Sequence, residues 1–268
     1  MTAEGNILKM SAKLGTSVEY FLPIGNELLN MNQFINHKIQ LIFSGVINCV
    51  SCGKRIKKTY SQGYCYPCFI NIPETSECII KPELCKAHLG ISRNMEWSKN
   101  FCLQKHFVYL SLTSGIKVGV TRETQIPTRW IDQGATKAIK FAKTPNRNIA
   151  GIIEVALKKH IADKTNWRKM LTNEITSNSN LFDEKEKLKE FIPKEHIKLF
   201  CQDNEITEIN FPVERYPTKV KSINLDKTNS FSGILAGIKG QYLIFDNDFV
   251  INIRKYGGYN ICIKTLPE

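Results

Sequence analysis

The chain has 268 residues, of which 42% are hydrophobic and 23% are charged. This composition excludes a disordered chain, because such chains bury too little apolar surface to offset the entropy of ordering. The 37 Lys and Arg residues exceed the 25 Asp and Glu residues, which gives a net charge of +12. A surplus of this size favours DNA or RNA as a partner, because each neutralised phosphate releases counterions. A soluble surface that is merely basic is the alternative.

Neither a secretory signal nor a membrane span is expected. The first ten residues, MTAEGNILKM, contain an acid and no apolar core. The longest apolar stretch, 41–50, is interrupted by Ser44, Gly45 and Asn48, and it is shorter than the roughly 20 residues that span a bilayer. We therefore expect a cytoplasmic protein without a membrane partner. Its nine cysteines then indicate metal ligands or free thiols rather than disulfides.

Strand-like runs occur near both ends of the chain. They cover 18–22, 39–43, 206–213, 231–245 and 249–263. We predict an α+β protein in which residues 1–48 and 206–268 form one β-module. A cysteine-rich zinc-ribbon module at 49–106 and an α/β core with a helical extension at 107–205 would be inserted into it. The polar run TSNSN at 176–180 predicts a loop or linker.

Two CxxC motifs, at Cys49/Cys52 and Cys65/Cys68, are separated by twelve residues. Each short loop turns two thiolates to the same side, so the four sulfurs suit one tetrahedral zinc. Four thiolates leave no open position for water, and we therefore expect a structural zinc rather than a catalytic one. The alternatives are four buried apolar cysteines or a redox CxxC.

A second group is less regular in its spacing. Its five candidate ligands are Cys78, Cys85, His88, Cys102 and His106. At most four of them can bind one zinc, and we favour the three cysteines over either histidine. The alternative for each histidine is a surface or hydrogen-bonded side chain. Cys201 and Cys262 stand alone and are expected to be ordinary thiols.

Basic and aromatic residues alternate between and beside the two CxxC motifs. They are Lys54, Arg55, Lys57, Lys58, Tyr60, Tyr64 and Tyr66. This combination suits contact with a nucleic-acid backbone and stacking on bases. A solvated charged hairpin is the alternative.

The central segment predicts a hairpin followed by two helices. Strands are expected at 106–112 and 116–121, with a turn between them. Apolar residues at helical spacing then predict helices over 128–143 and 149–163, the first of them capped by Thr128. Glu154 lies off the apolar stripe of the second helix, so the pattern alone favours a surface position.

The runs VYL, KVGVTR, TRWIDQGA and AGIIE, between residues 108 and 154, resemble the GIY-YIG nuclease superfamily. The resemblance matches Tyr109 to the tyrosine of the first motif, Val118-Gly119 to the end of the second, and Arg129 to the helix arginine. It matches Glu154 to the glutamate that holds Mg²⁺ or Mn²⁺. The first motif lacks its glycine, and Lys117 stands where the second usually has tyrosine.

The CxxC ribbon together with the terminal strands also resembles an uncharacterised prokaryotic zinc-ribbon family, known only as a domain of unknown function. The two resemblances imply a zinc-containing protein that acts on nucleic acid as a divalent-metal-dependent endonuclease, with Tyr109, Arg129 and Glu154 as catalytic residues. A divalent cation and a guanidinium suit this chemistry, because both neutralise charge on a phosphodiester. The alternative is a non-catalytic, zinc-dependent DNA- or RNA-binding protein that keeps the fold. We expect nucleic acid to be held by Lys54, Arg55, Lys57, Lys58 and Lys117.

Overall fold

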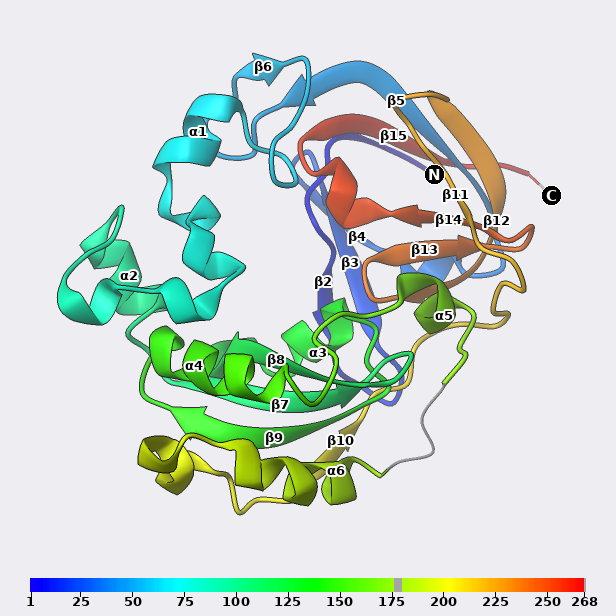
Figure 1. The fold of residues 1–268 in the computed structure, drawn as a ribbon. Helices are drawn as coiled ribbons and strands as arrows, with labels where there is room; N and C mark the ends of the chain where they lie inside the picture. The colour runs from blue at the N-terminus through cyan, green and yellow to red at the C-terminus, as the bar shows by residue number, and fades with distance from the viewer. Residues whose placement is uncertain (176–179, 268) are drawn as a thin grey trace. The chain divides into compact units, whose positions relative to one another are not determined.

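The computed structural model describes residues 1–175 and 180–267. Most of the loop expected at 176–180 therefore lies outside the described residues. The chain divides into two compact units. The first comprises Met1–Phe69, Leu171–Asn173 and Asn210–Glu268, and the second comprises Ile70–Met170 and Glu174–Ile209. Together they make a mixed α+β protein with several sheets (Figure 1).

The first unit is built mainly from β-strands. They are β1 (Thr2–Asn6), β2 (Ser11–Lys13), β3 (Glu19–Ile24), β4 (Glu27–Asn30), β5 (Lys38–Asn48), β6 (Arg55–Ile56), β11 (Lys221–Ser222), β12 (Ser230–Lys239), β13 (Tyr242–Phe245), β14 (Phe249–Asn252) and β15 (Tyr259–Thr265). One sheet has the order β1-β15-β5-β12-β13-β14-β11, with β6 paired to β5, and a smaller sheet has the order β2-β3-β4.

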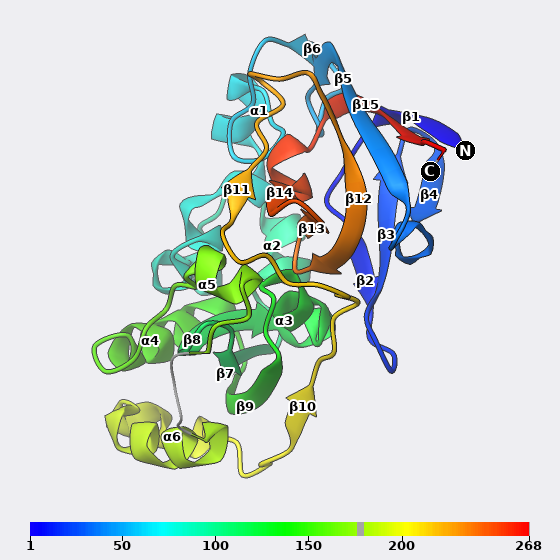
Figure 2. The same cartoon turned by 90° about the vertical axis from the view of Figure 1, so that its right-hand side faces the viewer.

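Strands from the two ends of the chain meet in the larger sheet (Figure 2). β5 pairs with β12 on one side and with β15 on the other, and β15 also pairs with β1. The alternation of Tyr20, Leu22 and Ile24 in β3 buries one face of the smaller sheet. Both CxxC motifs belong to this unit. The first of them directly follows β5.

The second unit has a four-stranded antiparallel sheet. Its elements are β7 (His106–Leu112), β8 (Ile116–Arg122), β9 (Lys137–Thr144), β10 (Ile206–Glu208), α2 (Met95–Phe101), α3 (Thr128–Asp132), α4 (Arg147–Leu157) and α6 (Leu181–Leu188). The strand order is β10-β9-β7-β8, and α4 and α6 both pack against β7 and β9 (Figure 1). Buried side chains of the sheet and of both helices form one core, including Leu110, Phe141, Ile153 and Leu181.

Two expectations for this region are wrong. The helix expected over 128–143 ends at Asp132, and the following residues form β9, which pairs with β7. Gly134 has a φ of +71°, a left-handed conformation that ends helices. The apolar spacing of this segment suits a helix or a strand, and pairing with β7 decides between them. Thr128 does not cap α3 either, because Pro127 precedes the helix and no side-chain cap forms.

The run that begins at residue 206 also differs from its expected place. Its strand, β10, pairs with β9 in the second unit rather than with the strands of the first.

α4 begins after Asn146, whose side chain accepts a hydrogen bond from the Ile149 N–H at 3.0 Å. Within residues 1–175 and 180–267, no helix has the length and apolar character needed to cross a membrane.

Candidate functional site

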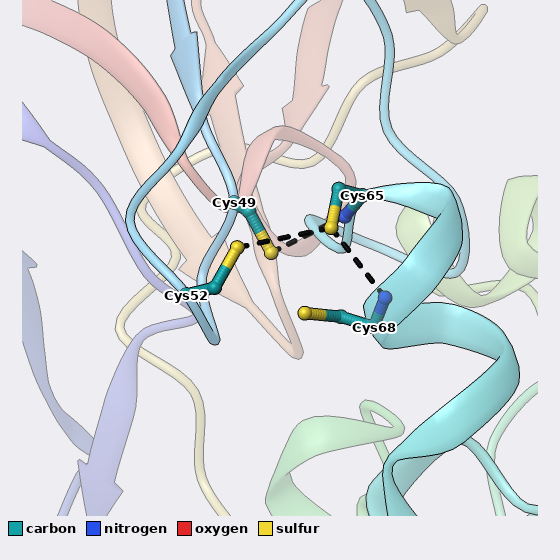
Figure 3. Close-up of side chains that lie close together, drawn as sticks. All are labelled: Cys49, Cys52, Cys65 and Cys68. Carbon is teal, nitrogen blue, oxygen red and sulfur yellow. Dashed lines mark hydrogen bonds between the residues drawn. The ribbon is translucent and has the colours of Figure 1, made fainter.

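The two CxxC motifs form a compact group of four sulfurs (Figure 3). Their Sγ atoms all lie within 4.8 Å of one another, and those of Cys52 and Cys65 are 3.8 Å apart. Two thiolates on one tetrahedral zinc, with bonds of about 2.3 Å, lie about 3.8 Å apart. The cysteines therefore have the spacing that a tetrahedral zinc site requires, as the motifs predict.

Backbone hydrogen bonds favour the thiolate of Cys49, whereas a hydrogen bond with the Cys65 side chain raises the pKa of Cys68 to about 12. The Cys65 N–H donates to the Sγ of Cys49 at 3.2 Å, and the Cys68 N–H donates to the Sγ of Cys65 at 3.5 Å. Burial opposes ionisation of Cys49, but backbone hydrogen bonds lower its pKa to about 6. Gly53, at a φ of +71°, closes the first turn by donating to the Cys49 carbonyl at 2.9 Å. The chain is thus prepared for a soft metal ion at this position.

The basic residues of the ribbon lie at its surface. Lys54, Arg55, Lys57 and Lys58 are all exposed. Lys58 Nζ lies 5.1 Å from the centre of the Tyr60 ring, and that ring lies 5.3 Å from Tyr66 and 5.9 Å from Phe69. Cations and aromatic rings thus occur together on the exposed part of the ribbon.

The structure brings together three members of the second candidate zinc group. The Sγ atoms of Cys78, Cys85 and Cys102 lie within 4.8 Å of one another. Neither His88, which is exposed, nor His106 joins them at this distance. His106 is buried, and its Nδ1 lies 2.7 Å from the carbonyl oxygen of Gln104. Hydrogen bonds with Cys78 and Cys85 lower the pKa of Cys102.

A third group of polar side chains lies on the β7–β8 hairpin. Tyr109 is directly opposite Gly119, and Ser111 is opposite Lys117, so these four residues share one face of the hairpin. A Cβ atom on Gly119 would lie 2.6 Å from the Tyr109 hydroxyl. Glycine is therefore the residue that lets the tyrosine ring lie across β8.

The Tyr109 hydroxyl is held in place by α3 and its C-terminal cap. It donates to Oε1 of Gln133 at 2.8 Å, and the ring packs edge-on against Trp130 with 6.0 Å between ring centres. Burial raises the pKa of Tyr109, and the adjacent Arg129 guanidinium, within hydrogen-bonding reach, offsets part of that rise. The partner Gln133 was not expected from the sequence, because an isolated glutamine after a short helix carries no recognisable signal.

Lys117 is buried, with only 4% exposure. Its side chain forms no hydrogen bond or salt bridge with the described residues. Burial, and then the neighbouring Arg129 charge, lower its pKa to about 8, while Asp163 and Glu154 oppose this shift. An unpaired cation beside an arginine suits an anionic ligand.

Glu154 is also buried, with 7% exposure, and the surface position expected from its helical spacing is wrong. It is one of six buried residues of α4, a helix that packs both on the sheet and on the short 3-10 helix Pro82–Leu84. Burial raises the pKa of Glu154, and Lys158 offsets part of that rise. Lys158 Nζ lies 3.4 Å from Oε2 of Glu154 and 3.4 Å from Oδ2 of Asp163.

The fold thus places Arg129 and Glu154 close enough to Tyr109 and Lys117 to influence the ionisation of both. A carboxylate with oxygens available is the ligand type that Mg²⁺ prefers, and Mg²⁺ retains several waters, so one carboxylate suffices to hold it. Asn166, which the resemblance to the GIY-YIG superfamily offers as a match for a later polar active-site residue, is exposed. Its Oδ1 accepts from the Lys169 N–H at 3.2 Å, at the start of α5 (Trp167–Leu171).

Comparison with known families gives one match. The model of the family DUF2797, described as a protein of unknown function, matches residues 36–261. The chain belongs to the DUF2797 family. The matched region of this DUF2797 protein includes both cysteine groups and the hairpin with Tyr109 and Lys117. No curated protein and no solved structure matches the chain.

Proposed function

We propose that this chain is a zinc-containing, divalent-metal-dependent phosphodiesterase that acts on nucleic acid. The observation that carries the proposal is the proximity of Arg129 and Glu154 to Tyr109 and Lys117, two residues on the same face of the β7–β8 hairpin. Two neighbouring cations, a buried phenol and a buried carboxylate suit a phosphodiester and a divalent cation.

The topology supports a relationship to GIY-YIG nucleases. Two strands, a short helix, a third strand and a longer helix follow one another as β7, β8, α3, β9 and α4, and β7 lies between β8 and β9. The tyrosine and the glycine that match the two motifs, Tyr109 and Gly119, face each other across the hairpin. The tyrosine ring fits there only because the residue opposite it has no side chain, so the two motif residues depend on each other.

Each side chain has a role that its surroundings suit. Arg129 and Lys117 would bind the non-bridging oxygens of the phosphate and offset the charge that develops there. Gln133 orients the Tyr109 hydroxyl, which would position the attacking water. Glu154 would hold Mg²⁺ or Mn²⁺, which supplies Lewis-acid stabilisation of the phosphodiester when bound. Lys158 would turn away from Glu154 toward Asp163, its other partner.

The exposed ribbon would make its own contact with nucleic acid. Lys54, Arg55, Lys57 and Lys58 would contact phosphates, and the adjacent Tyr60 and Tyr66 offer rings on which unpaired bases can stack. This surface belongs to the first unit, whereas the hairpin site belongs to the second.

A non-catalytic nucleic-acid-binding protein is the second candidate. It is favoured by Lys117, which replaces the usual tyrosine of the second motif, and by the Lys158–Glu154 salt bridge, which engages the metal-binding carboxylate. In this reading the same face binds phosphate without cleaving it.

One experiment separates the two functions. Wild type and Glu154→Gln would be incubated with labelled single-stranded, duplex and branched DNA and with RNA, in Mg²⁺ or Mn²⁺, with binding measured on the same samples. The exposed Glu195 provides a matched control, Glu195→Gln. The phosphodiesterase requires cleavage by wild type and by the control, and its loss in Glu154→Gln with binding retained. Binding by all three proteins without cleavage would establish the non-catalytic alternative.

A further inference from the structure

The group formed by Cys78, Cys85 and Cys102 has three cysteines, whereas the ribbon group has four. Its three Sγ atoms lie within 4.8 Å of one another, as the four of the ribbon do. Three thiolates provide three of the four ligands that a zinc ion takes. Among the described residues, no other Cys, His, Asp or Glu ligand atom joins this group at that distance.

A pocket adjoins the three sulfurs. Its volume is about 420 Å³, and all three cysteines line its wall together with Ser98, Trp97 and Arg93. Neither His88 nor His106 lines this pocket. Zinc sites that keep one coordination position open toward a cavity differ in this way from closed structural sites. The remaining position at the three cysteines therefore faces space that a small molecule can enter.

The surroundings of the pocket are positively charged. Lys86 and Arg93 line it, and the only acid that lines it in the described part of the chain, Glu77, is 2.9 Å from Lys81 Nζ. The buried Arg147 donates to the Cys78 carbonyl at 3.2 Å and to the Phe101 carbonyl at 3.1 Å. A divalent zinc with three thiolates carries a net negative charge, and these cations offset it. An additional small anion is therefore tolerated.

We propose that Cys78, Cys85 and Cys102 hold a zinc ion whose fourth position is open and binds a small anionic ligand from the adjoining pocket. This site is separate from the hairpin with Tyr109 and Glu154 and does not depend on phosphodiesterase activity. Its rival is a closed site in which a histidine moves in as the fourth ligand. His106 is the stronger histidine candidate, because its Nε2 is buried without a hydrogen-bond partner.

The test uses the full chain loaded with Co²⁺, whose visible absorption reports ligand number and type at thiolate sites, and sodium azide as the probe. Wild type is expected to bind two Co²⁺ per chain at thiolate sites, counted by thiolate-to-cobalt absorption, which a metal held by the carboxylate of Glu154 does not produce. Azide should change the spectrum in a saturable manner, because it binds at the open position of the three-cysteine site. The four-thiolate ribbon site has no open position and should not respond. Cys85→Ser should retain the ribbon cobalt and lose the azide response, whereas Cys201→Ser, which alters a cysteine outside both groups, should behave as wild type.

Two further variants sharpen the outcome. Lys86→Gln/Arg93→Gln should weaken azide binding about two- to fivefold through loss of positive charge at the pocket. His106→Ala should leave the azide response of wild type unchanged. Two Co²⁺ per chain with no azide response in wild type, and a response that appears only in His106→Ala, would overturn the open position in favour of a histidine ligand. Only one Co²⁺ per wild-type chain would overturn the site itself, even if Cys85→Ser fails to fold.

Discussion

The hydroxyl of Tyr109 occupies the space that a side chain at residue 119 would need. A Cβ atom on Gly119 would lie 2.6 Å from that hydroxyl and 2.8 Å from the adjacent ring carbon. The hydroxyl cannot move freely, because Gln133 accepts its hydrogen bond at 2.8 Å. The position of the tyrosine therefore depends on a glycine in the neighbouring strand.

Gly119→Ala should destabilise the protein by about 1–3 kcal/mol, because the ring must shift within a packed interior. The relevant measurement is chemical denaturation of wild type, Gly119→Ala, Tyr109→Phe and the double variant. The double variant should be less destabilised than the sum of the single changes, since removal of the hydroxyl relieves the closer of the two contacts. Additive effects would mean that the two residues do not interact as the hairpin register indicates.

Lys117 should make phosphate binding depend on pH near 8. Burial and Arg129 lower its pKa to about 8, so its positive charge is present below that pH and is lost as the pH rises through it. Nucleic-acid affinity should therefore fall between pH 7 and pH 9. Lys117→Gln should bind more weakly at pH 7 and show a flatter profile.

The exposed Lys194 provides the control, since Lys194→Gln should keep the pH profile of wild type. Arg129, Glu154, Asp163 and Tyr109 also influence Lys117 or lie beside it. An unchanged decline in Lys117→Gln would therefore show that the pH dependence does not come from Lys117.

The same pKa affects stability. A lysine with a pKa of about 8 in the folded chain and its ordinary value when unfolded binds fewer protons in the folded state between those values. Its contribution to the free energy of unfolding therefore rises as the pH increases from about 8 toward 10.5. Lys117→Met should be more stable than wild type at pH 7, with a difference that shrinks toward pH 10, as denaturation at both pH values would show.

Removal of metal should unfold the ribbon. A site assembled from Cys49, Cys52, Cys65 and Cys68 does not exist in the unfolded chain, so the binding free energy contributes to folding. Chelation, or the substitution Cys65→Ser, should lower the melting temperature and release one zinc per chain from the ribbon. Cys262→Ser, outside both cysteine groups, is the control. Full zinc content in Cys65→Ser would contradict the assignment.

The exposed basic residues of the ribbon should control the salt dependence of nucleic-acid binding. Replacement of Lys54, Arg55, Lys57 and Lys58 by glutamine should reduce the slope of log affinity against log salt by about one for each phosphate that is no longer neutralised. A variant with four other exposed lysines replaced, Lys13, Lys38, Lys194 and Lys227, controls for net charge. Equal slopes in the two variants would show that the ribbon makes no specific contribution.

Local patterns determined several features of this protein. The four-sulfur group follows from the CxxC spacing, because two residues between cysteines suffice to turn both thiols to one side. The hairpin of β7 and β8 follows from strand-like runs joined by a short turn, and its contacts lie close together in the sequence. In both cases the interacting residues are near neighbours, so their chemistry and spacing contain the necessary information.

Contacts between distant residues decided the rest. Pairing with β7 made a strand of Lys137–Thr144 although its apolar spacing also suits a helix. Tertiary packing around α4 buried Glu154, which the helical pattern alone places at the surface. Residue type favoured Cys78, Cys85 and Cys102 over the two histidines, but only tertiary structure brings these three cysteines together, since their spacing in the sequence is irregular. The physical reason is that burial and long-range pairing outweigh local preferences that differ by only about 1 kcal/mol per residue.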